Sequence, residues 1–421
     1  MLKFLHAADL HLDSPMRGLE RYEGAPADQM RGATRRALEN LVRLAIDETV
    51  RFVIIAGDLY DTDWKDYNTA LFLSQQMSRL RQAGIRVFVI AGNHDAASQI
   101  TRSLRMPENV RILSTREPET ILLDDLGVAI HGQGFAERAV RHDLSANYPS
   151  ARRDCFNVGI LHTAATGRAG HEPYAPCTIE GLLSKNYDYW ALGHVHQREI
   201  LHENPWIVFP GNTQGRHVNE SGAKGCTLAT VQDGRCVAVE PRNLDVVRWK
   251  LCDIDISAAD SAEDLLDRAR RRLEEESRDA DGLLVATRIR ILGDSAAHAD
   301  LIRNPEKWAG EIRAAATDLS GGTIWIEKVI ISTRPRISIE DRIAQNDPVA
   351  DLLRLIQELQ PGDEILDPLR DELTTLRTKL PAELVQDNPV FDPDSPESAR
   401  EILENARQIL FTALLAGGGQ P

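Results

Sequence analysis

The sequence predicts an α/β fold in which two β-sheets pack face to face between outer helices, a four-layer α-β-β-α sandwich. Short apolar runs of strand character support this prediction, at residues 4–5, 52–55, 87–90, 158–161 and 190–192. Between the first three runs, apolar residues recur at helical spacing, such as Leu41 and Leu44, and then Leu73 and Met77. Helical crossovers of this kind imply right-handed connections within one sheet. After about residue 120 the strands follow each other more closely, with hairpin turns such as Asp233–Gly234.

The length indicates more than one domain. At 421 residues the chain exceeds what one hydrophobic core usually covers. We assign residues 1–245 to the sandwich, residues 246–335 to a small second α/β domain, and residues 336–421 to a helical C-terminal tail.

The second domain has a β-α-β-α-β pattern. Strands are predicted at residues 249–256, 283–292 and 324–332, and helices at residues 261–277 and 300–316. Ser261 and Asp264 form a capping box at the start of the first helix. This helix carries an arginine cluster that is either a solvated face balanced by nearby glutamates or a DNA-backbone contact: Arg268, Arg270, Arg271 and Arg272.

The tail is divided by prolines into short segments that carry apolar side chains. Leu352, Leu355 and Ile356 belong to one such set, and Ile402 and Leu403 to a later one. Short amphipathic helices without a domain-sized core are typical of segments that dock into a groove on a partner. The alternative is a helical appendage that folds back on the second domain.

Side chains with metal-binding atoms follow the predicted strands of the sandwich. The set consists of Asp9, His11, Asp58, Asn93, His162, His194 and His196. Side chains at the carboxyl ends of strands in such folds converge on one crevice. Seven nitrogen and oxygen ligands are too many for one small ion and suit two divalent ions that share a carboxylate. Two cations ~3.5–4 Å apart can clamp a phosphate, hold a bridging water as hydroxide and stabilise both oxygens of an in-line displacement.

The ligand types and the neighbouring glycines refine this prediction. Imidazole, carboxylate and amide ligands without a thiolate favour Mn²⁺ or Fe²⁺ over a structural zinc site, while ligand type alone does not separate Mn²⁺, Fe²⁺, Zn²⁺ and Co²⁺, of which we expect Mn²⁺. Gly57, Gly92 and Gly193 stand directly before ligands. Because glycine permits tight turns, we expect these residues to let the backbone swing the next side chain onto a metal.

Composition suggests a soluble cytoplasmic protein. Hydrophobic residues make up 42% and charged residues 27% of the chain, and no stretch approaches the ~20 apolar residues of a membrane span. The five cysteines include no Cys-x-x-Cys pair, which indicates free thiols in a reducing compartment. The first strand leads directly into a ligand, so we expect no cleaved signal peptide.

The net charge of −15 is unusual for a protein that binds DNA, because DNA binding draws on a basic surface. From Arg336 onward there are 17 acidic against 8 basic residues, so the tail accounts for −9 of the −15. We expect weak affinity for free DNA and a partner that supplies the basic track.

Read in order, the ligand segments resemble the calcineurin-like metallophosphoesterase superfamily, whose pattern is D-x-H, G-D, G-N-H-D/E, H and G-H-x-H. Within it the chain is similar to the DNA-repair exonucleases of the SbcD type, and most of all to their YhaO branch. Residues 8–15, 57–61 and 210–217 carry this resemblance. It implies that the sandwich is a nuclease domain and that the second domain is a small cap that helps to select the form of DNA.

The resemblance also implies roles for individual residues. One ion would be bound by Asp9, His11, Asp58 and His196. The other would be bound by Asp58, Asn93, His162 and His194, with Asp58 as the bridge. His94 would contact the scissile phosphate and assist departure of the leaving oxygen, and Asp95 would orient His94.

Three further residues are candidates for substrate binding. Arg216 and His217 follow the last ligand loop closely enough to face the substrate. Asp61 stands where some relatives carry a second active-site histidine, three residues after the bridging aspartate. This departure affects how a DNA end would be positioned but leaves the two-metal chemistry intact.

The expected function is that of a Mn²⁺-dependent DNA exonuclease or endonuclease in DNA repair. The resemblance implies that the C-terminal helices bind an SbcC-like, SMC-type ATPase, and it leaves a homodimer open. The enzymatic alternative is a phosphodiesterase or phosphatase for small molecules, because fold does not fix the substrate. The non-enzymatic alternative is a scaffold with the same fold.

Overall fold

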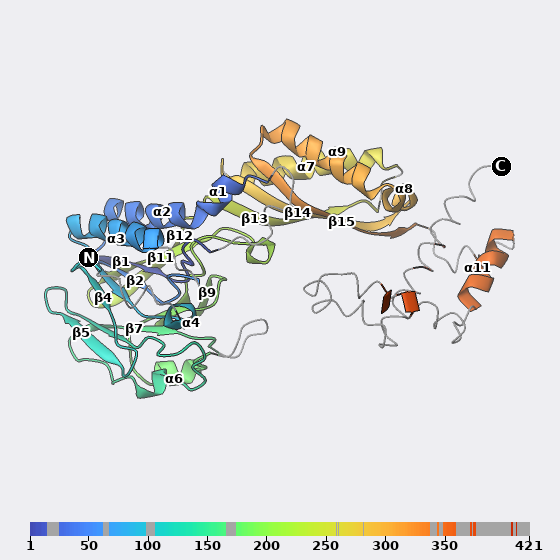
Figure 1. Cartoon of the computed structure of the whole chain (residues 1–421). Coiled ribbons are helices and arrows are strands. Elements are labelled where there is room, and N and C mark those ends of the chain that lie inside the picture. Colours follow the sequence, from blue (N-terminus) through green and yellow to red (C-terminus); the bar gives the residue numbers. More distant parts are fainter. Residues whose placement is uncertain are drawn as a thin grey trace. The chain divides into compact units, whose positions relative to one another are not determined.

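The computed structural model describes most of the first 336 residues and part of the tail (Figure 1). The described residues are 1–14, 25–61, 67–97, 106–165, 174–257, 259, 261–280, 282–336, 343–344, 348–358, 371–372, 374–375, 406 and 410. They contain two six-stranded sheets and one three-stranded sheet.

The first sheet has the order β12-β11-β1-β2-β3-β4, with parallel pairing from β1 to β4 and antiparallel pairing of β11 with β1 and β12. Its strands are β1 (Leu2–Ala7), β2 (Phe52–Ile55), β3 (Arg86–Val89), β4 (Val110–Ile112), β11 (Gly225–Gln232) and β12 (Arg235–Asn243). Helices α2 (Ala33–Asp47) and α3 (Tyr67–Gln82) cover its outer face, and α1 (Ala27–Arg31) precedes them. Leu41 and Met77 pack there against Val53 and Val87, as the helical spacing predicts.

The second sheet has the order β5-β6-β7-β8-β10-β9, with antiparallel strands at both edges. Its strands are β5 (Glu119–Leu123), β6 (Val128–Gly132), β7 (Phe156–His162), β8 (Tyr189–Gly193), β9 (Glu199–Glu203) and β10 (Trp206–Phe209). The two sheets share a core in which the ring of Phe4 stacks on Phe52 at 4.9 Å and meets Tyr189 edge-on at 5.1 Å. This aromatic contact fixes one sheet against the other, so the loops at their ends keep a defined geometry.

The fourth layer is thinner than the prediction suggests. On the outer face of the second sheet, Trp190 packs against Leu182 of α6 (Ile179–Leu183) and against Tyr148, which follows the 3-10 helix η2 (Ser145–Asn147). The helices of this layer are a single turn each, and irregular chain provides the remaining cover. The predicted α/β sandwich is confirmed, with loops in place of long helices on this side.

The three-stranded sheet has the order β13-β14-β15 and carries the predicted β-α-β-α-β pattern. Its elements are β13 (Val247–Asp255), α7 (Glu263–Asp279), β14 (Leu284–Ser295), α8 (His298–Arg303), α9 (Pro305–Ser320) and β15 (Ile324–Pro335). The capping box is present, with reciprocal bonds of 3.2 and 3.3 Å between Ser261 and Asp264. The single helix predicted over residues 300–316 is wrong. Asn304 leaves the helical region at φ −128°, because the proline that follows disfavours it there.

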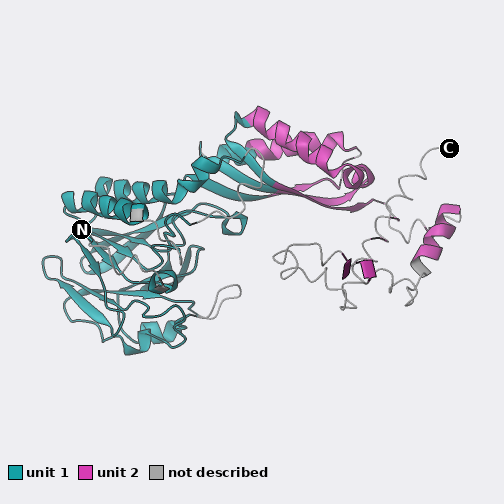
Figure 2. Cartoon of the chain, viewed as in Figure 1, with its two compact units in different colours: residues 1–251, 275–288, 320–327 teal, residues 252–274, 289–319, 328–421 magenta. Residues whose placement is uncertain are grey.

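The chain divides into two compact units, coloured separately in Figure 2. The first unit comprises residues 1–251, 275–288 and 320–327, and the second comprises residues 252–274, 289–319 and 328–421. Within the first unit, Trp249 and Trp325 meet edge-on at 6.2 Å and share a core with Met30 and Val218. Through this core, the first residues of β13, β14 and β15 (247–251, 284–288 and 324–327) belong to the first unit. The domain boundaries at residues 245 and 335 remain a prediction.

The described part of the tail contains the amphipathic helix α11 (Pro348–Glu358). Leu352 and Leu355 are exposed, whereas Ala350 and Leu353 are buried. The later apolar sets of the predicted docking region lie outside the described residues, apart from Leu410, which is exposed. None of the described helices is both long and apolar enough to cross a bilayer.

Candidate metal centre

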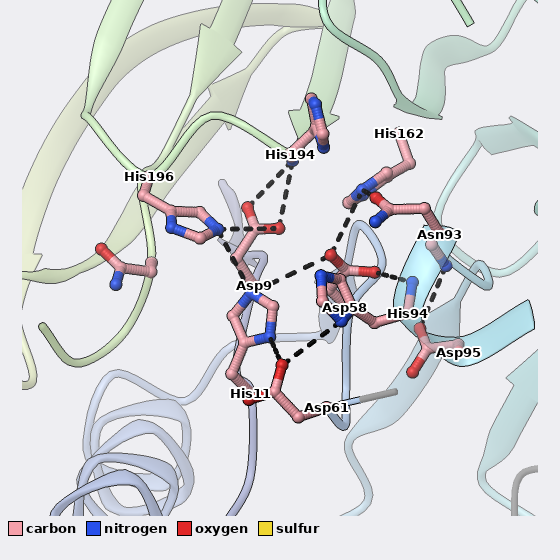
Figure 3. A network of polar contacts seen from close by, with 12 residues as sticks. Asp9, His11, Asp58, Asp61, Asn93, His94, Asp95, His162, His194 and His196 are labelled. Atoms are coloured by element: carbon pink, nitrogen blue, oxygen red, sulfur yellow. Dashed lines mark hydrogen bonds and ion pairs between the residues drawn. The ribbon is translucent and has the colours of Figure 1, made fainter. Parts of the chain in front are cut away.

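The predicted ligands come from loops at the carboxyl ends of neighbouring strands in both sheets, and Figure 3 shows how they converge. Asp9 and His11 follow β1, and Asp58 follows β2. Asn93 begins the short helix α4 (Asn93–Ala97) after β3, His162 ends β7, and the two remaining histidines follow β8. The pairing of β1 with β2 and of β7 with β8 brings these loops to one edge. Most of these side chains are buried, while those of His94 and His196 keep 26% and 21% exposure at the rim.

The loops hold several ligands in a backbone conformation that non-glycine residues rarely adopt. Asp9, His11, Asp58 and His194 have φ values of 52°, 43°, 54° and 98°. Each such residue costs free energy and persists only where the surrounding structure enforces it, which is common at functional sites. Here the Asp9 amide donates to Gly57 O at 3.0 Å and the His11 amide to Asp58 O at 3.1 Å, so the first two loops fix each other.

The three glycines serve two different purposes, which corrects the expectation that all three permit turns. Gly57 has φ +96° and fits that expectation. Gly92 and Gly193 lie outside the positive-φ region and are required by close packing instead. A Cβ on Gly92 would lie 2.2 Å from Asp58 Oδ1, and one on Gly193 would lie 1.9 Å from Ala56 O.

His162 is held as a neutral ring with a lone pair directed into the pocket. Its Nδ1 lies 2.9 Å from the carbonyl oxygen of Ala56 and therefore donates to it. Its Nε2 faces Asn93 Oδ1 at 2.9 Å and Asp58 Oδ2 at 3.6 Å, all of them acceptor atoms. Burial lowers the pKa of His162 to about 3, so the ring stays neutral and suited to a metal.

His11 and His196 form a second pair with the same electronic arrangement. Their Nδ1 atoms lie 3.2 Å from Asp61 Oδ1 and 2.7 Å from Glu220 Oε1, and a ring N–H that donates to a carboxylate leaves Nε2 as an acceptor. The two Nε2 atoms then face each other at 3.2 Å. Two lone pairs at this distance repel, and a cation that both of them ligate removes the repulsion.

Burial makes the carboxylates of Asp9 and Asp58 costly to ionise. Burial, together with the charge of Asp58, raises the pKa of Asp9 well above its usual value. Burial likewise raises the pKa of Asp58 to about 6. Carboxylates desolvated in this way are unfavourable unless a cation compensates them, and a bound dication does so directly. The donor set therefore fits divalent metal ions.

The donor atoms gather into three groups in which every atom lies within 4.8 Å of the others. The groups are Asp9, His11 and His196; Asp9, Asp58 and His162; and His11, Asp58 and His94. Asp58 Oδ2 lies 3.9 Å from His11 Nε2 and 3.6 Å from His162 Nε2, which is the central position expected of a shared carboxylate. The third group brings His94 within reach of a cation, although we expected it to contact only the phosphate.

His194 is placed differently from the other predicted ligands. Its amide donates to Asp9 Oδ2 at 2.9 Å, so its main chain orients a ligand. Its ring packs against those of His162 and Tyr174, with centroids 5.1 and 5.7 Å apart. The ring is in none of the three donor groups formed by the described residues, so its role as a ligand remains a prediction.

Asp95 and Asp61 require a correction to the expected arrangement around His94. The carboxylate of Asp95 accepts hydrogen bonds from the amides of Leu59, Tyr60 and Gly92 and so ties the second ligand loop to the third. The carboxylate beside His94 is that of Asp61, 3.3 Å from Nδ1. Asp61 is thus a partner of histidines, and its predicted substrate contact is untested.

Arg216 and His217 differ strongly in their surroundings. The Arg216 guanidinium is largely buried, 2.8 Å from Glu220 Oε1 and 3.6 Å from Asp61 Oδ1. The His217 side chain is 55% exposed and lies 3.6 Å from Glu220. Glu220, in the 3-10 helix η3 (Val218–Glu220), is absent from the predicted site, because a single glutamate in a loop gives no sequence signal that it is buried against a ligand.

Comparison with known proteins identifies two segments of the chain. A model of the calcineurin-like phosphoesterase family matches residues 2–198, the segment that carries all the predicted ligands. Residues 2–198 form a calcineurin-like phosphoesterase domain. A second model, described as the middle domain of metallophosphoesterase YhaO, matches residues 249–334.

Two relatives resemble the chain over about half of its length or more. The "Uncharacterized metallophosphoesterase YhaO" of Bacillus subtilis (strain 168) is 37% identical over 262 residues, which are 61% of this chain and 64% of that protein. The "DNA double-strand break repair protein Mre11" of Methanopyrus kandleri is 29% identical over 235 residues, 51% of this chain and 49% of that protein. The chain thus spans less than two thirds of each relative.

Solved structures with a related fold are more distant. A Thermus thermophilus protein is 14% identical, with a TM-score of 0.34 over 58% of this chain and 99% of its own. A dimetal phosphatase from Danio rerio is 12% identical, with a TM-score of 0.34 over 55% of this chain and 93% of its own.

Proposed function

We propose that this phosphoesterase is a metal-dependent DNA nuclease that acts in DNA repair as the nuclease subunit of a complex with an SbcC-like ATPase. The observation that carries the hydrolytic part is the pocket itself, where ring nitrogen and amide oxygen atoms suited to ligate cations face each other at 2.9 and 3.2 Å. The similarity to the Mre11 relative, described by its name as a double-strand break repair protein, supports DNA as the substrate.

The ligand sets implied by the motif fit this geometry. Asp9, His11 and His196 would hold one cation, and Asn93, His162 and His194 the other, with Asp58 shared between them. Bound there, two divalent cations supply a nucleophile at neutral pH and stabilise the charge that develops on the phosphate. We expect Mn²⁺ as the native ion.

His94 is the residue of the pocket best placed to act on the substrate. Its side chain lies at the rim with 26% exposure, and its amide donates to Asp58 Oδ1 at 3.0 Å, which fixes it to the shared carboxylate. The ring Nδ1 faces Asp61, and in the imidazolium form Nε2 also carries a proton, which would pass to the departing 3′ oxygen. The bond from phosphorus to that oxygen breaks as the proton is transferred.

The carboxylates of the pocket make turnover dependent on metal. Asp9, Asp58 and Asp61 all lie where an anionic phosphate would approach, and their charge repels it. Cations in the pocket reverse the sign of this field. The whole chain has a net charge of −15, which also repels DNA. A partner with a basic surface would therefore support DNA binding.

The partner would bind through the tail. Leu352 and Leu355 expose apolar surface on α11, as expected of a helix that docks on another protein. Gel filtration of the chain co-expressed with the coiled-coil ATPase should show one complex. The double variant Leu352→Asp, Leu355→Asp should separate the two proteins, and separation of the wild-type chains would argue against the assignment.

The decisive experiment for the substrate compares Mn²⁺-dependent turnover of linear duplex DNA, cyclic nucleotides and phosphopeptides by the purified chain and its complex. We expect DNA to be cleaved, and Asn93→Ala to abolish cleavage with the fold retained. Preferred hydrolysis of a small ester would replace the nuclease assignment with a phosphodiesterase or phosphatase. Bound metal without any hydrolysis would indicate a scaffold.

A further inference from the structure

We infer that Glu220 is a positioning residue for one of the two cation sites, acting through His196 and, by way of Arg216 and Asp61, through His11. This inference rests on the proposed two-metal function. Glu220 touches neither cation position; it fixes the two imidazoles whose Nε2 atoms lie 3.2 Å apart.

Both oxygens of Glu220 are fully engaged, so the carboxylate has one orientation. Oε1 lies 2.7 Å from His196 Nδ1 and 2.8 Å from Arg216 Nη2. Oε2 accepts from the Arg216 amide at 2.8 Å and from Asn212 Nδ2 at 2.9 Å. The Arg216 guanidinium contacts both oxygens, with Nε 3.3 Å from Oε1 and 3.4 Å from Oε2, so the carboxylate is held by its own cation.

Arg216 extends this arrangement to the other ligand of the pair. Its Nη1 lies 3.6 Å from Asp61 Oδ1, and that oxygen lies 3.2 Å from His11 Nδ1. A continuous series of hydrogen bonds and ion pairs therefore runs from His196 through Glu220, Arg216 and Asp61 to His11. Imidazole ligands need such partners to fix the ring orientation and the position of the proton.

On the other side of the pocket, a main-chain oxygen and not a carboxylate orients the histidine ring. His162 Nδ1 donates to the main-chain oxygen of Ala56 at 2.9 Å, and its Nε2 faces Asn93. A change at Glu220 should thus weaken the site of His11 and His196 and spare that of His162. The loop that carries His196 has separate support, because Lys224 Nζ donates to His196 O at 2.7 Å.

The test is Mn²⁺ titration calorimetry of protein stripped with EDTA. Wild-type protein should bind two ions per chain. Glu220→Gln keeps the shape of the side chain but removes its charge and one acceptor. We expect one site to weaken by about 10- to 100-fold and the other to keep its affinity.

The matched control is Glu327→Gln. Glu327 is also buried and forms a bidentate pair with Arg288, at 2.7 Å for both contacts, in the β13-β14-β15 sheet. The Glu327→Gln protein should bind two Mn²⁺ ions, as the wild type does. Arg216→Lys keeps the positive charge but shortens the side chain that contacts Asp61, so it should weaken the same site as Glu220→Gln. This second variant provides the test if Glu220→Gln does not fold.

Two tight sites in Glu220→Gln, or equal weakening of both, would overturn the inference, and so would wild-type binding by Arg216→Lys. Wild-type protein that binds no Mn²⁺ would instead overturn the proposed function, so the two failures are distinguishable.

Discussion

The pocket and the β13-β14-β15 sheet use the same charged residue types in opposite ways. In the sheet Asp253 has a guanidinium partner: it contacts Arg290 at 2.7 and 2.6 Å, and the hydrogen bond lowers the pKa of Asp253. In the pocket, burial raises the pKa values of Asp9 and Asp58, and the guanidinium of Arg216 is directed to Glu220. Asp253 is thus compensated within the sheet, whereas bound cations would compensate Asp9 and Asp58 in the proposed metal centre.

The largest effect should come from removing the shared carboxylate. Asp58→Asn should abolish metal-dependent hydrolysis and reduce metal binding, because Asp58 lies between both donor sets. The matched change in the sheet, Asp253→Asn, should leave activity unchanged. Turnover assays and metal analysis of both proteins check this, and an active Asp58→Asn enzyme would remove the distinction between the two regions.

The next largest effect concerns His94. We expect His94→Ala to lower kcat by about 10²- to 10⁴-fold, the usual contribution of a positioned proton donor. Metal content should stay at the wild-type level. Metal analysis beside kinetics separates the two roles, and loss of a bound ion would make His94 a ligand, consistent with its place in the third donor group.

A smaller effect is expected in the pH dependence of the metal-free protein. Burial raises the pKa of Asp95 to about 7, above its unfolded value, so the folded state binds more protons and is stabilised as pH falls from 8 towards 7. Burial lowers the pKa values of His6 and His162 to about 3, which costs stability below about pH 6.5, while the raised pKa values of Asp9 and Asp58 add stability over the same range and oppose this loss.

Thermal unfolding in EDTA should therefore show a melting temperature that rises as the pH falls from 8 to 7 and levels off below that. Saturating Mn²⁺ should shift the highest stability to higher pH, because protons compete with the metal for its ligands. A melting temperature that falls steadily from pH 8 to 6 in EDTA would contradict the assigned environment of the pocket.

The smallest effect should come from Arg290→Ala in the sheet. Both members of this pair are exposed by about 40% (40% and 44%), and exposed pairs contribute little. Calorimetric unfolding should show a change close to the resolution of the measurement. A large loss of stability would mean that the sheet depends on its ion pairs as strongly as the pocket depends on metal.

The sequence is informative where chemistry and chain order coincide. Asp9, Asp58 and His162 stand at strand ends, so their convergence follows from the strand pattern. The partners Asp61 and Glu220 could not be assigned, because which carboxylate meets which ring depends on how loops from separate strands pack.

Two features of the backbone, the glycine before His194 and the break between α8 and α9, differ in how far the sequence predicts them. The packing role of Gly193 depends on the carbonyl of Ala56, which lies far away in the sequence and which no local pattern records. In contrast, the break between α8 and α9 at Asn304 could have been predicted from Pro305, which follows it.

The central claim is that this pocket binds two divalent cations around Asp58. Crystals grown with Mn²⁺ and measured at the manganese absorption edge should show two anomalous peaks ~3.5–4 Å apart, on either side of the Asp58 carboxylate. One peak should lie near His11 and His196 and the other near Asn93 and His162. A single peak, or none at saturating Mn²⁺, would contradict the account.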